Sequence, residues 1–269
     1  MYYNLFDSHL HSDHSWDAKH SVTFLCETAV KKGVLGISIT DHCEINEYES
    51  RQIERRIKQC HFEILKARAA FGERLLISNG IELGQMTQDP ALTEHVFSLV
   101  DFDFVIGSTH CIHGDQDFYF MDFKGADPYA LLSDYFDELL TVAKLGRFDT
   151  LAHLTYPLRY MNGKYHLGVE LSPMDDRIDE LFKILIQSGK ALEINTSDLR
   201  KDPPVLIPPL KYLKRYRELG GELITFGSDA HCAEDIAEGI PEAMEFAKEA
   251  GFRYFAFYKQ RVPRMLEIF

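Results

Sequence analysis

The residues of this chain best suited to chemistry begin in the stretch DSHLHSDHSWDA, residues 7–18, which holds three histidines and three aspartates. The stretch follows a short, largely apolar segment at 2–6 that is typical of a β-strand. In an extended backbone, residues two apart point to the same side, so His9 and His11 can present both imidazoles to one point. Neutral imidazole and carboxylate are ligands that suit zinc, iron and manganese. The stretch therefore has the composition of a metal site, although a polar loop with solvated histidines explains these residues alone equally well.

Similar residues follow the other short apolar segments of the chain. They occur in the motifs SITDH, NGIEL, IGSTH, TLAHL, LEINTS and TFGSDAH. Together with the first stretch, these motifs supply nine candidate metal ligands: His9, His11, Asp17, His42, Glu82, His110, His153, Asp229 and His231. Nine ligands are too many for one catalytic ion and suit two or three ions held by a bridging carboxylate, for which Glu82 and Asp229 are the candidates. Several divalent ions would also attract an anionic substrate.

The elements that must position these motifs are short apolar strands alternating with longer helices. Helix signals include Ser21 before a helically spaced apolar face, Gly33 after it, and Asp127 before a proline. Repeated β-then-α units predict parallel strands, and seven or eight of them predict a closed or nearly closed barrel. The carboxyl ends of barrel strands meet on one face, so this α/β fold would gather the nine candidates in one pocket. With no linker in the sequence, we expect one domain over residues 1–269. The strand-like runs lie at 4–7, 35–40, 75–81, 104–107, 150–152, 191–194, 223–226 and 253–257.

Composition and charge narrow the class of partner. Forty-two acidic against 29 basic residues give a net charge of −13, which disfavours a nucleic-acid or anionic-membrane surface. No apolar run approaches the length of a membrane span and no leader precedes the first strand, so we expect a soluble, cytoplasmic protein. The five cysteines are scattered and never form a CxxC pair, which is typical of free thiols in a reducing compartment. The residues give no indication of the oligomeric state.

The ordered set of motifs resembles that of the polymerase and histidinol phosphatase (PHP) family of phosphoesterases. The segments DSHLHS, TDH, GIEL, STH, AHL and GSDAH carry the resemblance, which spans residues 7–231. Chain length and the segments EINTS and LRY are most similar to the stand-alone histidinol-phosphate phosphatases within that family. The resemblance implies a distorted (β/α)7 TIM-like barrel and a metal-dependent phosphomonoesterase that converts L-histidinol phosphate to L-histidinol and phosphate in histidine biosynthesis. It implies a metal-bridging hydroxide as the nucleophile.

The resemblance also implies a trinuclear site of divalent ions, which would be zinc, manganese or iron. Many family members have a histidine where this chain has Asp17, and a carboxylate can replace that imidazole. Among the ligands, the expected catalytic residues are Glu82, Asp229 and His231. Carried over motif by motif, the implied ligands are His9, His11, Glu82 and Asp229 for one ion, Glu82, His110 and His153 for a second, and His42 and His231 for a third, with Asp17 beside them.

Substrate-binding candidates follow two of the predicted strands. Arg159 in TYPLRY and Arg200 in NTSDLR could clamp a phosphate, because arginine makes forked contacts with phosphate oxygens. Ser197 and Asn195 are weaker candidates for hydrogen bonds in the same pocket. Four further histidines near the expected pocket have no assigned role: His14, His20, His113 and His166.

Alternative functions remain open at this point. The chain could be a PHP-type phosphoesterase acting on another small phosphomonoester, a nucleotide or a nucleic-acid end, or a metal-dependent amidohydrolase with a similar barrel and HxH pair. The segment LVDFDFV, with Asp101 and Asp103, matches the opening motif of haloacid-dehalogenase-type phosphatases, but that reading leaves the histidines without a role. We therefore interpret it as the polar start of a strand, and expect the partner to be a small phosphomonoester rather than nucleic acid or a membrane.

Overall fold

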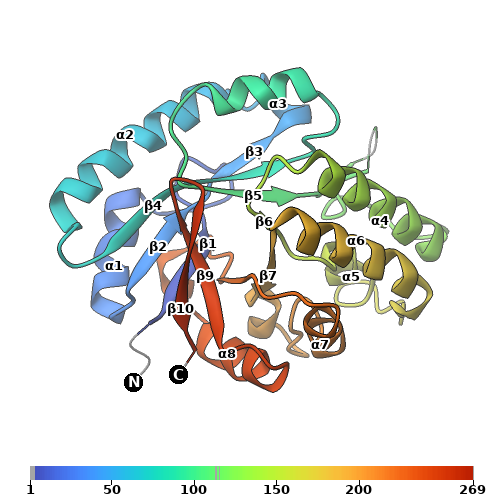
Figure 1. The fold of residues 1–269 in the computed structure, drawn as a ribbon. Coiled ribbons are helices and arrows are strands. Elements are labelled where there is room, and N and C mark those ends of the chain that lie inside the picture. The colour runs from blue at the N-terminus through green and yellow to red at the C-terminus, as the bar shows by residue number, and fades with distance from the viewer. Residues whose placement is uncertain (1–3, 113, 115, 269) are drawn as a thin grey trace.

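Seven parallel strands form the central sheet of the computed structural model, which describes residues 4–112, 114 and 116–268. Their order is β1-β2-β4-β5-β6-β7-β8, and the short β3 pairs with β4 beyond the end of β2. Figure 1 shows the helices arranged around the outside of this sheet. The strands are β1 (Phe6–Leu10), β2 (Gly36–Ile39), β3 (His42–Glu44), β4 (Leu76–Gly84), β5 (Phe104–Ser108), β6 (Thr150–Leu151), β7 (Ala191–Asn195) and β8 (Ile224–Gly227).

The sheet closes where β1 meets the end of β8. Leu10 forms a parallel bridge with Ala230, and the backbone N–H of Asp229 donates to the carbonyl of His9 at 2.7 Å. The buried carboxylate of Asp7 accepts from the backbone N–H of Ser228 at 2.9 Å, across 221 residues of sequence. The predicted distorted (β/α)7 barrel is therefore confirmed. β1 extends beyond the predicted run at 4–7, so His9 lies within the strand rather than behind it.

The helices begin and end largely at the signals in the sequence. Ser21 caps α1 by accepting from the N–H of Phe24, and Gly33 ends that helix with a left-handed φ of 71°. Asp127 caps α4 in the same way. No helix within the described ranges is long and apolar enough to cross a membrane. The α-helices are α1 (Val22–Lys32), α2 (Ile53–Phe71), α3 (Pro90–Phe97), α4 (Pro128–Leu145), α5 (Tyr156–Met161), α6 (Asp175–Ser188), α7 (Leu210–Glu218) and α8 (Ile240–Glu249), and the 3-10 turns are η1 (Ile45–Glu47), η2 (Ser172–Met174), η3 (Ser197–Arg200) and η4 (Ala233–Asp235).

A C-terminal hairpin stands apart from the barrel sheet. It consists of β9 (Tyr254–Lys259) and β10 (Val262–Glu267), which pair with each other in antiparallel fashion. The predicted strand at 253–257 therefore belongs to this hairpin and not to the barrel. Its turn residues, Gln260 and Arg261, have φ values of 52° and 61°, a conformation more often occupied by glycine or asparagine.

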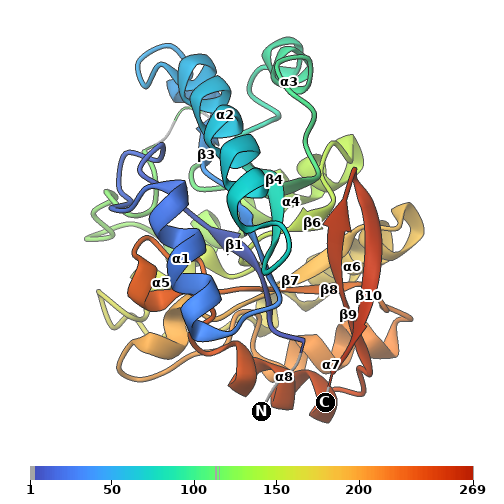
Figure 2. The ribbon, with the colours of Figure 1, turned by 90° about the vertical axis from the view of Figure 1, so that its left-hand side faces the viewer.

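The hairpin covers the amino ends of the barrel strands. Asp103, just before β5, accepts from the N–H of Gln260 at 2.9 Å, and Asp149, just before β6, pairs with Arg261 at 2.5 Å. The ring of Tyr258 stacks on Phe104 with centroids 5.0 Å apart. Figure 2 shows the hairpin in dark red along one side of the molecule. The hairpin therefore covers this end of the barrel. Asp103 lies at the polar start of β5, as we interpreted it from the sequence, and it also accepts a hydrogen bond from the hairpin turn.

Candidate metal centre

The carboxyl ends of the strands bring all nine predicted ligands together. His9 lies in β1, His42 in β3 and Glu82 in β4, whereas the others directly follow a strand or lie in the loops beyond β1 and β8. Six of the nine residues are buried, the side chain of His42 is 10% exposed, and those of His231 and Asp17 are 33% and 43% exposed. The strand ends therefore bring residues that are far apart in the sequence into one cluster.

Glu82 lies at the centre of this cluster. Its Oε2 atom is 2.7 Å from Nδ1 of His42 and 3.5 Å from Nε2 of His9. Its Oε1 atom is 3.0 Å from Nε2 of His153 and 3.2 Å from Nε2 of His110. One carboxylate therefore faces imidazoles from four strand ends, the position expected of a bridging ligand.

Asp229 and Asp17 complete the cluster on the side of β8. Oδ1 of Asp229 lies 3.5 Å from Nε2 of His11 and 3.8 Å from Nε2 of His9. Oδ2 of Asp17 lies 3.5 Å from Nε2 of His42 and 3.5 Å from Nε2 of His231. Asp17 thus occupies the place between two imidazoles that the resemblance assigned to a third ion.

The cluster passes a test of fit for divalent metal ions. Two buried imidazole nitrogens have no hydrogen-bond partner among the described residues: Nε2 of His9 and Nε2 of His11. Ligand atoms of three overlapping groups lie within 4.8 Å of one another: His9, His11 and Glu82; His42, Glu82 and His110; and His11, His42 and His231. Zinc–nitrogen bonds are about 2.0–2.1 Å long, so donors at such separations can share an ion. Unpartnered imidazole nitrogens beside buried carboxylates in this arrangement fit a divalent-metal site.

The pKa shifts of Glu82 and His9 show that the buried carboxylates of this cluster favour positive charge beside them. Burial penalises ionisation, yet the charges of His110, His42 and His9 hold the pKa of Glu82 well below its usual value. Burial likewise opposes protonation of His9, but the carboxylates of Glu193 and Glu82 raise its pKa well above the usual value. In the metal-free protein, imidazolium protons therefore balance the buried carboxylates. Bound divalent ions would take over that role and release these protons.

Two buried carboxylates outside the predicted set contact imidazoles of predicted ligands. Glu193 of β7 lies 2.6 Å from Nδ1 of His9, and Glu44 of β3 lies 2.8 Å from Nδ1 of His110. Such contacts fix the tautomer of a ligating histidine and direct its other nitrogen at the metal. The sequence contained one signal: Glu193 interrupts the apolar run ALEIN at a position where a buried strand normally carries an aliphatic residue.

A third carboxylate supports the first histidine loop. Asp41 accepts hydrogen bonds from the hydroxyl of Ser15 at 2.7 Å and from the backbone N–H of Ser12 at 2.7 Å. The Ser15 oxygen in turn lies 3.2 Å from Nδ1 of His11. Asp41 therefore acts on the metal site through Ser15, although its place in the motif SITDH alone would equally suit a ligand.

A cavity of about 890 Å³ opens over the cluster. Arg159 lines it with its guanidinium near Ser197, 3.0 Å from Asp198 and 3.5 Å from Oδ2 of Asp229. Lys201, which the sequence did not single out, also lines the cavity. A cationic wall therefore lies beside the metal ligands.

The other predicted substrate-binding residues lie around this wall. Asn195 lies with its amide 3.4 Å from Asp229 and accepts from the hydroxyl of Ser197 at 2.6 Å. Arg200 donates to the carbonyl of Ser228 at 2.8 Å and lies 3.4 Å from Asp235. It is not among the residues that line the cavity.

The four unassigned histidines have different positions. His14 lies 3.5 Å from Glu63, and His20 accepts from the backbone N–H of Ala233. His166 has a left-handed φ of 53° in the loop after α5. His113 lies outside the described residues. None of the three described histidines lines the cavity over the cluster.

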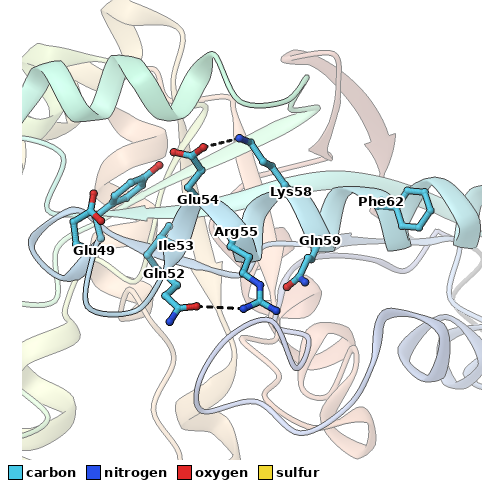
Figure 3. A pocket seen from close by; sticks show the side chains of 9 residues that line it. Glu49, Gln52, Ile53, Glu54, Arg55, Lys58, Gln59 and Phe62 are labelled. Atoms are coloured by element: carbon cyan, nitrogen blue, oxygen red, sulfur yellow. Dashed lines mark hydrogen bonds and ion pairs between the residues drawn. The ribbon is translucent and has the colours of Figure 1, made fainter.

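A second hollow, of about 650 Å³, lies on the outer side of α2 (Figure 3). Its polar side chains pair along the helix, Glu54 with Lys58 at 2.5 Å and Gln52 with Arg55 at 3.5 Å. None of the nine predicted ligands lines it. The predicted ligands are therefore associated with the cavity at the strand ends and not with this hollow.

A closed parallel barrel with clustered histidines and carboxylates at its strand carboxyl ends is the architecture of a metalloenzyme. Residues 7–197 match the PHP domain, and the chain belongs to this family. The chain is 30% identical to the "Probable histidinol-phosphatase" of Thermotoga maritima over 94% of its own length and 95% of the relative's. It is 29% identical to the protein of the same name from Clostridium acetobutylicum, over 95% and 98% of the two chains.

A solved structure shares the fold. The histidinol phosphate phosphatase of Lactococcus lactis subsp. lactis, crystallised with zinc, L-histidinol and phosphate, superposes with a TM-score of 0.81. The alignment covers 97% of this chain and 99% of that one, at 24% identity. The two proteins therefore share their fold over nearly the whole of both chains.

Proposed function

We propose that this chain hydrolyses L-histidinol phosphate to L-histidinol and phosphate in a metal-dependent reaction. The observation that carries the proposal is the convergence of a buried multi-histidine cluster and a cationic wall on one cavity. The names of relatives that align over nearly the whole chain support the choice of substrate. Three metal ions, of zinc, manganese or iron, are proposed from the number of candidate ligands.

The proposed ion sites follow the grouping of the side chains. The first would use His9, His11, Glu82 and Asp229, the second Glu82, His110 and His153, and the third His42, His231 and Asp17. Divalent ions bound there supply an activated water for attack on phosphorus and offset the charge of the phosphate oxygens.

Arg159 is the residue of this chain proposed to bind the phosphate. Its side chain is 11% exposed and lines the cavity, and its guanidinium lies 3.5 Å from Asp229. Asp198 lies 3.0 Å from Nε of the guanidinium, and the hydroxyl of Ser197 accepts from its Nη2 group. The arginine is thus pre-oriented, which lowers the entropy lost when it binds an anion. Binding of the phosphate by Arg200 stays a prediction, and the kcat/KM of Arg200→Ala tests it.

Glu82, Asp229 and His231 are the proposed catalytic residues. Glu82 belongs to two of the proposed ion sites, and Asp229 belongs to the first and lies 3.6 Å from Nδ1 of His231 in the third, so the loss of either would disturb more than one ion. His231 is held by a contact of 3.1 Å between its Nδ1 atom and the carbonyl of Asp229, which leaves Nε2 facing Asp17. All three line the cavity.

Phosphate release from a substrate panel, with metal content measured in the same samples, tests this function. The panel contains L-histidinol phosphate, phenyl phosphate, a nucleoside monophosphate and an oligonucleotide with a terminal phosphate. We expect the highest kcat/KM for L-histidinol phosphate in protein with about three ions per chain. Glu82→Gln should abolish turnover, whereas the matched change Glu94→Gln on the exposed face of α3 should not. Greater activity on another member of the panel would replace the proposed substrate, and no phosphate release from fully loaded protein would refute the function.

A further inference from the structure

The cavity over the metal cluster contains one carboxylate that neither binds the cluster nor pairs with a cation. The lining cations have partners: Arg51 pairs with Glu47 at 2.9 Å, Lys201 with Asp198 at 2.7 Å, and Arg159 also with Asp198. Asp117 lines the same cavity and has no ion pair with any described residue. A partly buried carboxylate without a counter-charge is costly, so it marks a place where a cationic ligand gains affinity.

Asp117 is held in a defined orientation by neutral donors. The hydroxyl of Tyr156 donates to its Oδ1 atom at 2.9 Å, and the backbone N–H of Tyr119 donates to the same oxygen at 2.8 Å. No described group donates to its Oδ2 atom. One carboxylate oxygen is therefore anchored and the other is available to a ligand.

The anchor also fixes how far Asp117 lies from the reacting end of the cavity. The ring of Tyr156 packs against the rings of His110 and His153, with centroids 4.8 and 5.0 Å away. Asp117 therefore lies one tyrosine away from two proposed metal ligands. A ligand whose phosphate meets the metals can reach this carboxylate only if its positive charge is close to its ester oxygen.

Aromatic side chains extend from Asp117 toward the mouth of the cavity. Tyr119 and Phe120 line it with 56% and 66% of their surfaces exposed, and their rings meet edge to face at 4.8 Å. Large aromatic groups with this exposure offer faces to a flat or cationic ring. This part of the wall suits a heteroaromatic group farther from the ester than the positive charge.

We propose that Asp117 binds the ammonium group of an amino-alcohol phosphate and that Tyr119 and Phe120 cover its aromatic ring. The inference rests on the proposed function and deepens it, because it assigns the subsite for the organic half of the substrate. In L-histidinol phosphate the amine is on the carbon next to the ester-bearing carbon, and the imidazole lies beyond it. Asp117 is partly buried and one tyrosine away from His110 and His153, whereas Tyr119 and Phe120 are exposed, and this gradient matches the order ester, ammonium, ring.

The experiment compares two ligands that differ only in the amine, L-histidinol phosphate and 3-(imidazol-4-yl)propyl phosphate, on metal-loaded protein. We expect wild-type protein to prefer the aminated substrate in kcat/KM by roughly ten- to a hundredfold, the effect of one charge-assisted contact. Asp117→Asn keeps an acceptor for Tyr156 and removes the charge, so the preference should disappear. Asp122→Asn, in the same loop but outside the cavity lining, is the matched control and should retain it.

Calorimetric binding of L-histidinol and of its deaminated analogue tests the subsite independently of turnover. If Asp117→Asn loses the preference for the aminated ligand in both kinetics and binding, the inference is supported. Tyr156→Phe should reduce that preference only in part, because the charge of Asp117 remains. Equal loss of both ligands in Asp117→Asn, or no preference in wild-type protein, overturns it. If neither phosphate ester is hydrolysed but L-histidinol still binds through Asp117, the proposed reaction fails and the subsite stands.

Discussion

Replacing Glu193 with glutamine tests how the barrel prepares its metal ligands. The buried carboxylate of Glu193 accepts from Nδ1 of His9 at 2.6 Å on one oxygen. Its other oxygen accepts from the backbone N–H of His153 at 2.7 Å and from the amide of Asn195 at 3.1 Å. Glutamine has nearly the same shape but only one accepting oxygen. Its NH2 group must therefore face a buried donor on one of the two sides.

The size of the effect follows from these contacts. A buried donor left without an acceptor costs about 1–3 kcal/mol of stability. If the amide turns its NH2 group toward His9, the imidazole loses the contact that directs Nε2 at the metal, and loss of such a contact weakens metal affinity roughly 10- to 100-fold. Each tenfold change corresponds to about 1.4 kcal/mol, so the metal measurement and the unfolding measurement should report losses of similar size.

Competition with a chromophoric chelator measures the affinity, and thermal unfolding of metal-loaded and metal-free protein measures the stability. Glu222→Gln is the control, because Glu222 precedes β8 on the surface with 78% of its side chain exposed. We expect weaker metal retention and a lower Tm in Glu193→Gln and neither change in the control. Wild-type metal affinity in Glu193→Gln would refute the idea that this carboxylate orients His9.

The remaining predictions concern the same cavity. Gly227→Ala should lower both Tm and metal content, because its Cβ would lie 2.5 Å from Oε1 of Glu193 and 2.5 Å from Cβ of His9. Arg159→Ala should lower kcat/KM roughly ten- to a hundredfold with metal content unchanged, and Arg200→Ala should lower it less, since Arg200 does not line the cavity. Metal-free protein should lose stability as pH rises above about 6.5, because the raised pKa of His9 means that the folded state holds this proton more tightly than the unfolded chain. Saturating metal should remove that pH dependence, since the metal binds the neutral imidazole.

Each of these predictions has an outcome that contradicts it. A Gly227→Ala variant with normal metal content would show that Glu193 and His9 can shift to accommodate the added methyl group without loss of metal binding. Equal losses of kcat/KM in the two arginine variants would place both guanidinium groups on the phosphate. A Tm of the metal-free protein that stays level or rises with pH above the usual histidine range would mean that His9 is neutral beside Glu193.

Local signals in the sequence were sufficient to predict the barrel and the placement of its polar side chains. Capped helices between short apolar runs dictate β-then-α repeats, and the carboxyl ends of such strands can meet only on one face. Glu82, His110 and His153 could therefore be expected in one pocket from the residue pattern, whereas their grouping around one ion was implied by the family resemblance. The distances between them depend on strand register, which the sequence pattern does not determine.

Features that depend on contacts between distant segments escaped prediction. The hairpin turn at Gln260 and Arg261 has no glycine or asparagine, so its left-handed residues give no turn signal. Glu44 and Glu193 belong to no recognisable sequence motif. Their contacts with His110 and His9 depend on how other strands pack and are visible only in the structure. Asp117 lies in a loop, and the position of this loop over the cavity cannot be predicted from a periodic sequence pattern.

The seam between β1 and β8 has a consequence for when the protein can acquire its metals. During synthesis, the strand with His9 leaves the ribosome long before the segment with Asp229, which must close the barrel against it. A chain that ends before β8 offers histidines without the carboxylate that completes their group, and it lacks the partner of Asp7 at the seam. We therefore expect ions to be captured after translation, by a barrel that has already closed, through the open mouth of the cavity. A cell short of metal would then accumulate a folded, empty enzyme that can be activated without new protein synthesis.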